Sequence, residues 1–139
     1  MKTAIDTNII SALWSGEPTA QIVSQTLNEA RFKGGLTICG PVYAELLAHP
    51  KAKASFVDEF LAAGRIAVDC DLDAVIWREA GLAFASYARR RRLEGMGEPR
   101  RLPVDYVVGS HAMLRADRLL TLDRTRYVQD FPGLQIAVP

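Results

Sequence analysis

The sequence predicts an α/β fold in which helices cover a parallel sheet, and three observations support this. Short aliphatic runs alternate with helix-like segments along the whole chain, as in strands joined by helical crossovers. The 139 residues are 49% apolar and 24% charged, a composition that can bury one core. No apolar run approaches the roughly 18 residues of a membrane span. We therefore expect a single domain, residues 1–139.

Five short runs have the composition of buried strands. Each is rich in aliphatic residues, and segments with helical patterns lie between them, which favours parallel pairing. The expected strands are Thr3–Ile5, Leu36–Cys39, Arg65–Val68, Leu119–Leu122 and Leu134–Val138.

The connecting segments carry helix signals. Gly34 and Gly35 end one helix, Pro41 suits the first turn of another, and Asp71 can cap a long third one. The segment Glu94–Arg101 is expected to be a flexible, charged loop. The expected helices are Asn8–Trp14, Thr19–Lys33, Pro41–Ala48, Lys51–Ala63, Leu72–Leu93 and Pro103–Ala116.

Charge is unevenly distributed along the chain. The net charge is +1, yet residues 78–126 carry 11 basic and 6 acidic side chains. Such a cluster could bind phosphates, or it could be a solvated helix end where the dipole favours cations. The cluster is dominated by Arg89, Arg90, Arg91, Arg92, Arg100 and Arg101.

Several other chemistries lack their residues. Cys39 and Cys70 match no zinc spacing and are expected to be buried, reduced thiols. His111 is expected to be a packed or surface histidine, and Ser110 lacks the glycine spacing of a nucleophile elbow. No signal-peptide core follows Met1, so the expected compartment is the cytoplasm, with no membrane contact.

Four acidic residues stand alone in segments that should pack inward: Asp6, Glu45, Asp105 and Asp123. Burying an uncompensated charge is costly, so each needs a partner. Helix capping or the helix dipole can account for the three aspartates. Glu45 lies further into its helix, on what is expected to be an apolar face, where neither role is natural.

Convergence on a cation would explain all four acids together. Ligands of open parallel sheets bind at the carboxyl ends of the strands, where strand order reverses. Asp6 and Asp123 follow expected strands, and Glu45 and Asp105 lie near the starts of helices. Carboxylates with water are the ligands that Mg²⁺ or Mn²⁺ prefers.

The motifs around these acids resemble those of PIN-domain ribonucleases, particularly the VapC-type toxins of bacterial toxin–antitoxin pairs. The resemblance covers essentially the whole chain, although Tyr106 stands where a small or aliphatic residue is more usual. The motifs are "IDTNII" with Asp6 and Asn8, "PVYAELLA" with Glu45, "PVDYVVGSHAM" with Asp105, and "LLTLD" with Thr121 and Asp123.

The resemblance implies a three-layer α/β/α sandwich with a central parallel sheet and an Mg²⁺- or Mn²⁺-dependent endoribonuclease. It also implies an RNA substrate, a small antitoxin partner and a homodimer. By position, Asp6, Asp105 and Asp123 resemble the metal-binding acids. Glu45 would reach the metal directly or through water, and Asn8 and Thr121 would orient the aspartates.

We expect the metal to bridge Asp6 and Asp105 to the scissile phosphate, while Asp123 or Glu45 orients the attacking water. An antitoxin helix could cover apolar residues such as Leu13. The arginines expected to bind flanking RNA phosphates are Arg100, Arg101, Arg124 and Arg126.

Two other interpretations remain open. In a phosphatase, Asp6 would be the nucleophile, but that chemistry usually has a second acid where this chain has Asn8. Alternatively, the chain could be a PIN-like module that binds RNA or a partner without cutting RNA.

Overall fold

Five parallel strands form one sheet at the centre of the computed structural model, which describes residues 1–139. All five expected strands are present, with ends shifted by up to two residues. The sheet has the order β3-β2-β1-β4-β5, so strand order reverses between β1 and β4. The strands are β1 Thr3–Ile5, β2 Leu36–Cys39, β3 Ile66–Asp69, β4 Arg118–Leu120 and β5 Ile136–Ala137.

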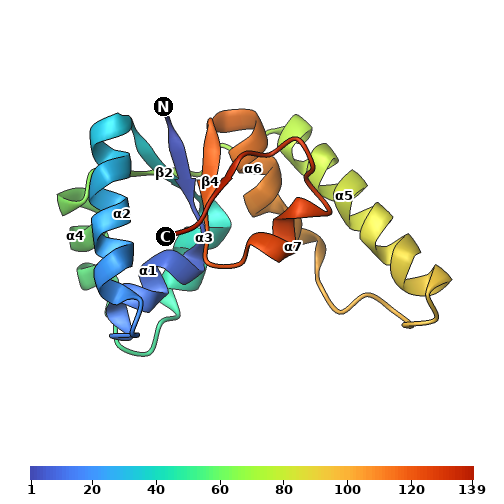
Figure 1. Ribbon diagram of the computed structural model, residues 1–139, viewed down its shortest axis with the longest axis horizontal. Coiled ribbons are helices and arrows are strands. Elements are labelled where there is room, and N and C mark those ends of the chain that lie inside the picture. Colours follow the sequence, from blue (N-terminus) through green and yellow to red (C-terminus); the bar gives the residue numbers. More distant parts are fainter.

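Helices cover both faces of this sheet (Figure 1). Helices α1, α2 and α4 lie on one side, and α5, α6 and α7 lie on the other. The expected three-layer α/β/α architecture with a parallel sheet is therefore confirmed. The helices are α1 Thr7–Trp14, α2 Ala20–Lys33, α3 Gly40–Leu47, α4 Ala54–Ala63, α5 Ala74–Leu93, the 3₁₀ turn η1 Pro103–Tyr106, α6 Val107–Arg115 and α7 Arg124–Val128.

The start of α5 differs from the expectation. Asp73, not Asp71, is its N-cap residue, because the Asp73 side chain accepts a hydrogen bond from the Ile76 backbone N–H. The Asp71 N–H is instead bound to the Asp69 carboxylate in the preceding turn. Asp71 and Asp73 have the same capping propensity and are close in sequence, and the turn after β3 leaves Asp73 at the N-cap position.

The core lies between the sheet and both helical layers. Ile5, Ile38 and Leu119 are almost completely buried on neighbouring strands. The position of Gly109 on α6 leaves no room for a side chain, because the ring of Phe131 fills that space. No helix is both long and apolar enough to cross a membrane.

The two cysteines are both free thiols, but they differ in exposure. Cys39 is buried at the end of β2, whereas Cys70 is exposed after β3. The expectation of two buried thiols is therefore wrong for Cys70. Strand β3 lies at the edge of the sheet, and the chain leaves the core directly after it.

Candidate active site

Asp6 lies at the carboxyl end of β1, where strand order reverses, and only 6% of its surface is exposed. Its Oδ1 accepts a hydrogen bond from the Thr7 N–H at 2.8 Å, which caps α1. Its Oδ2 accepts hydrogen bonds from the hydroxyls of Thr121, at 2.9 Å, and Tyr127, at 2.7 Å. Capping therefore explains one carboxylate oxygen, and a buried polar network surrounds the other.

Asn8 and Thr121 join the loop after β1 to the loop after β4. The Asn8 amide nitrogen lies 3.4 Å from Asp6 Oδ2 and 3.3 Å from the Thr121 hydroxyl oxygen. The Asn8 carbonyl oxygen accepts a hydrogen bond from the Leu122 N–H, and the Thr121 hydroxyl accepts one from the Asp123 N–H. Both side chains thus contact Asp6 while holding the neighbouring loop in place.

Tyr127 is a site residue that the sequence analysis missed. It lies on α7, is 2% exposed and donates its hydroxyl proton to Asp6. Burial raises the pKa of Tyr127, and the adjacent Asp6 carboxylate raises it further, so the phenol remains a donor at neutral pH. No local motif marks this residue, because the contact joins positions far apart in the sequence.

Asp105 has an internal counter-charge that its sequence neighbours did not reveal. Its Oδ2 accepts a hydrogen bond from the Leu102 N–H at 2.6 Å. Its Oδ1 lies 3.6 Å from the Arg126 guanidinium, which α7 supplies. The side chains of Asp105 and Arg126 lie next to Tyr127. The absence of a nearby basic residue in the sequence therefore did not mean that Asp105 lacks one in the fold.

Asp123 is exposed and serves as the N-cap of α7. Its Oδ1 accepts hydrogen bonds from the Arg126 N–H and the Thr125 hydroxyl. The capping alternative is therefore correct for this acid. Asp123 remains linked to Asp6 because the Thr121 hydroxyl contacts both residues.

Glu45 does not lie on the buried face of α3. Val42 and Leu46 are buried, whereas Glu45 is exposed, so the expected inward orientation is wrong. Successive helical residues are about 100° apart, and this step places Glu45 outside the buried stripe. Burial raises the pKa of Cys39, at the end of β2, to about 11, and the charges of Asp6 and Glu45 add to this rise. Glu45 makes no hydrogen bond or ion pair with the other three acids.

The carboxylates suit a hard divalent cation, although they do not form a closed cage. No three His, Cys, Asp or Glu side chains are grouped closely enough to hold a metal ion between them. Proteins usually bind Mg²⁺ through only one or two carboxylates, with water and substrate phosphate completing the shell. Asp6 offers an oxygen, Oδ1, that accepts only one hydrogen bond. This donor set fits Mg²⁺ or Mn²⁺ without a third protein ligand.

The arginine-rich region is partly structural. Only 9% of Arg91 is exposed, and its guanidinium donates hydrogen bonds to the carbonyl oxygens of Met96 and Glu98. The loop Glu94–Arg101, expected to be flexible, is thus bound to α5 through Arg91. Arg91 is therefore not free to bind a phosphate.

The four arginines expected to bind RNA fall into two pairs. Arg101 lies 3.8 Å from the carboxylate of Asp130, and Arg126 is paired with Asp105 as described above. Arg100 and Arg124 make no ion pair within the protein. Arg100 and Arg124 can therefore bind an external phosphate without first breaking an internal ion pair.

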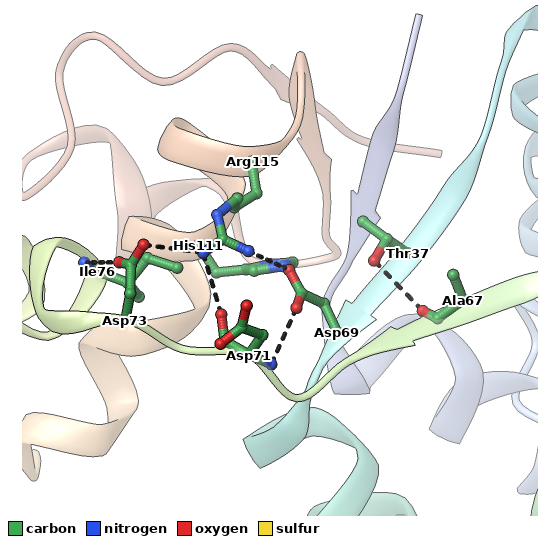
Figure 2. Close-up of polar contacts among 8 residues, drawn as sticks. All are labelled: Thr37, Ala67, Asp69, Asp71, Asp73, Ile76, His111 and Arg115. Atoms are coloured by element: carbon green, nitrogen blue, oxygen red, sulfur yellow. Dashed lines mark hydrogen bonds and ion pairs between the residues drawn. The ribbon is translucent and has the colours of Figure 1, made fainter.

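A second polar cluster joins β3, the start of α5 and α6 (Figure 2). The buried His111 side chain places Nε2 3.1 Å from Asp69 Oδ2, and Arg115 donates to the same oxygen at 3.0 Å. Arg115 also contacts the Asp73 carboxylate and the Asp71 carbonyl oxygen. Of the two expected alternatives, a packed or a surface histidine, His111 is the packed one, and its partners could not be predicted from the sequence.

We expect protonation of His111 to destabilise the fold. Burial lowers the pKa of His111 from its ordinary value of 6.5 and outweighs the opposite effect of Asp69. The unfolded chain therefore binds the proton first, so this stability is present above the ordinary pKa and is lost as pH falls below it. Thermal melting at about pH 7 and about pH 5 should show a larger decrease for the wild type than for His111→Gln.

His49→Gln is the matched control for this measurement. His49 is only half-buried and contacts the Ser15 hydroxyl.

Asp69 does not account for the expected effect between about pH 7 and about pH 5. Hydrogen bonds from the Asp71 N–H and His111, together with the Arg115 charge, outweigh the burial of Asp69 and lower its pKa, so its contribution to stability is lost only at more acidic pH. Equal decreases in the wild type and His111→Gln would contradict the prediction.

The PIN domain family model matches residues 3–130. The fold is similar to that of VapBC2 from Rickettsia felis, solved bound to a DNA fragment from the promoter, with a TM-score of 0.71, 23% identity, and coverage of 100% of this chain and 99% of that chain. It is also similar to VapBC-1 from nontypeable Haemophilus influenzae, with a TM-score of 0.64, 23% identity, and coverage of 99% and 98%. No curated protein sequence gives a significant match.

Proposed function

Because the chain belongs to the PIN-domain family, we propose that it is a metal-dependent endoribonuclease that hydrolyses phosphodiester bonds in RNA. The observation that carries this proposal is the Asp6 carboxylate. It is buried at the reversal of strand order and is contacted by the side chains of Asn8, Thr121 and Tyr127. It retains one oxygen with acceptor capacity. This is the position at which parallel sheets bind their ligands.

In this proposal some of the acidic residues bind the metal and others orient the attacking water. Asp6 and one further aspartate, Asp105 or Asp123, would hold Mg²⁺ or Mn²⁺, and the remaining acids, Glu45 among them, would act through bound water. A bound divalent cation supplies an activated water and a polarised phosphate. Among the exposed acids, Asp123 or Glu45 would orient the attacking water. Asp105 first has to exchange its contact with Arg126 for the cation.

The arginines would bind RNA in two ways. Arg100 and Arg124, which lack internal partners, would hold phosphates that flank the cleaved bond. Arg126 is paired with Asp105 and would become available when a cation neutralises that acid. Basic side chains near the acids would also reduce repulsion between RNA and the site.

We propose that the protein is the toxin of a toxin–antitoxin pair and works as a homodimer. Both structural neighbours described above are VapBC proteins. Leu13 and Phe60 line an open groove of about 260 Å³ between α1, α2 and α4. The half-buried Trp14 packs its ring against Phe60 and Phe56, and 44% of Phe56 is exposed. A small antitoxin could cover this apolar surface.

The test is RNA cleavage by the purified chain with Mg²⁺ or Mn²⁺ and with EDTA. Cleavage that requires the metal and leaves 5′-phosphate ends would support the proposal. Metal-independent RNA binding without cleavage would favour a non-catalytic PIN-like module. Trapping of a phosphoryl group on Asp6 would favour the phosphatase.

A further inference from the structure

The Tyr127 hydroxyl makes the shortest side-chain contact to the most buried acid of the site. It lies 2.7 Å from Asp6 Oδ2, compared with 2.9 Å for the Thr121 hydroxyl and 3.4 Å for the Asn8 amide. Both partners are nearly inaccessible: 2% of Tyr127 and 6% of Asp6 are exposed. The contact is therefore shielded from water and geometrically defined.

The two oxygens of Asp6 have different hydrogen-bond environments. Each carboxylate oxygen has two lone pairs. The hydroxyls of Tyr127 and Thr121 satisfy Oδ2, whereas Oδ1 accepts only the Thr7 N–H. One lone pair of Oδ1 is therefore the remaining acceptor of this carboxylate.

We propose that Tyr127 is a positioning residue for the metal: together with Thr121 it fixes the Asp6 carboxylate so that Oδ1, not Oδ2, binds the cation. This inference rests on the proposed function. Hydrogen-bond partners of a ligating group orient it, and their removal typically lowers metal affinity by about 10- to 100-fold. Without the Tyr127 hydroxyl, Asp6 Oδ2 would lose its closest hydrogen-bond donor. The carboxylate could then rotate, or bind the cation through either oxygen.

Helix α7 extends this role to the other aspartates. Arg126, the residue before Tyr127, contacts Asp105, and Asp123 caps the same helix. Three acids that are distant in sequence are thus connected to one short helix. The position of Tyr127 is consequently coupled to that of Asp105 as well as Asp6.

The test is Mn²⁺ binding by the full chain, measured by isothermal titration calorimetry without RNA. Tyr127→Phe removes only the hydroxyl oxygen, and we expect about tenfold weaker Mn²⁺ binding. Cleavage by this variant should fall at limiting Mn²⁺ and recover to within about twofold of the wild-type rate at saturating Mn²⁺. A purely structural role would not produce this dependence on metal concentration.

Tyr106→Phe is the matched control. Tyr106 is also 2% exposed, but its hydroxyl has no hydrogen-bond partner. The same chemical change should therefore leave Mn²⁺ affinity unchanged. Thermal melting in EDTA establishes that both variants are folded.

A measurement on the wild type provides a second test that does not depend on a variant. With tyrosines labelled with ¹³C at the ring carbon that bears the hydroxyl, the NMR signal of Tyr127 should shift on addition of Mg²⁺. The reason is that the Asp6 carboxylate, which accepts the hydrogen bond of Tyr127, then shares its charge with the cation. An unshifted signal would overturn the inference.

The outcomes separate the inference from the proposed function. Unchanged or tighter Mn²⁺ binding by folded Tyr127→Phe would overturn the positioning role alone. No Mn²⁺ binding by the wild type would overturn the metal-dependent function and this inference with it.

Discussion

Asp6→Asn should abolish metal-dependent RNA cleavage, with a loss of at least about a hundredfold in rate. The substitution keeps the side-chain shape but removes the negative charge. It also places an amide where a carboxylate now accepts hydrogen bonds from Thr7, Thr121 and Tyr127. The measurement is the cleavage rate of one labelled RNA at saturating Mn²⁺, with wild type and variant at equal concentration.

Asp71→Asn is the matched control for this experiment. Asp71 is exposed, and its carboxylate makes no hydrogen bond or ion pair within the protein. The same change of charge at Asp71 should leave the rate within about twofold of wild type. A folded Asp6→Asn variant that retained full cleavage would remove Asp6 from the mechanism.

Much of the fold could be predicted from local sequence. The strands ending at Ile5 and Cys39 are short aliphatic runs bounded by polar or glycine residues, and both occur as expected. Parallel pairing followed from the helices between strands. These features depend on periodicity and connection rules that act over short stretches. The strand order, which puts Asp6 and Thr121 on adjacent strand ends, depends on the long-range pairing of β1 with β4 and was not predicted.

The details of the site depend on contacts that no local pattern encodes. Tyr127 on α7 contacts Asp6 although the two are 121 residues apart in sequence, and Arg126 on the same helix contacts Asp105. The sequence showed Glu45 in an apolar segment, but helical rotation placed it outside the buried stripe. The sequence also did not reveal that Arg90 and Arg101 both lie next to the Asp130 carboxylate, or that Arg91 is bound to backbone carbonyl oxygens.

Among the arginines of the cluster, we expect Arg90 to contribute most to the unfolding free energy. Its guanidinium pairs with Asp130, whose side chain is 3% exposed, and the other arginine near that carboxylate is Arg101 at 3.8 Å. Arg90→Met keeps the aliphatic length but leaves a buried carboxylate without its close partner. We expect a loss of about 3 kcal/mol in unfolding free energy, measured by urea denaturation.

Two variants distinguish this explanation from a general effect of removing positive charge. Arg89→Met changes an exposed residue on the same helix that makes no ion pair, and should change stability by less than about 0.5 kcal/mol. Adding Asp130→Asn to Arg90→Met removes the stranded charge and should recover part of the loss, because the two residues act as one pair. If Arg90→Met and Arg89→Met were equally stable, Arg101 alone would compensate the charge of Asp130. Arg90 would then be available to bind RNA.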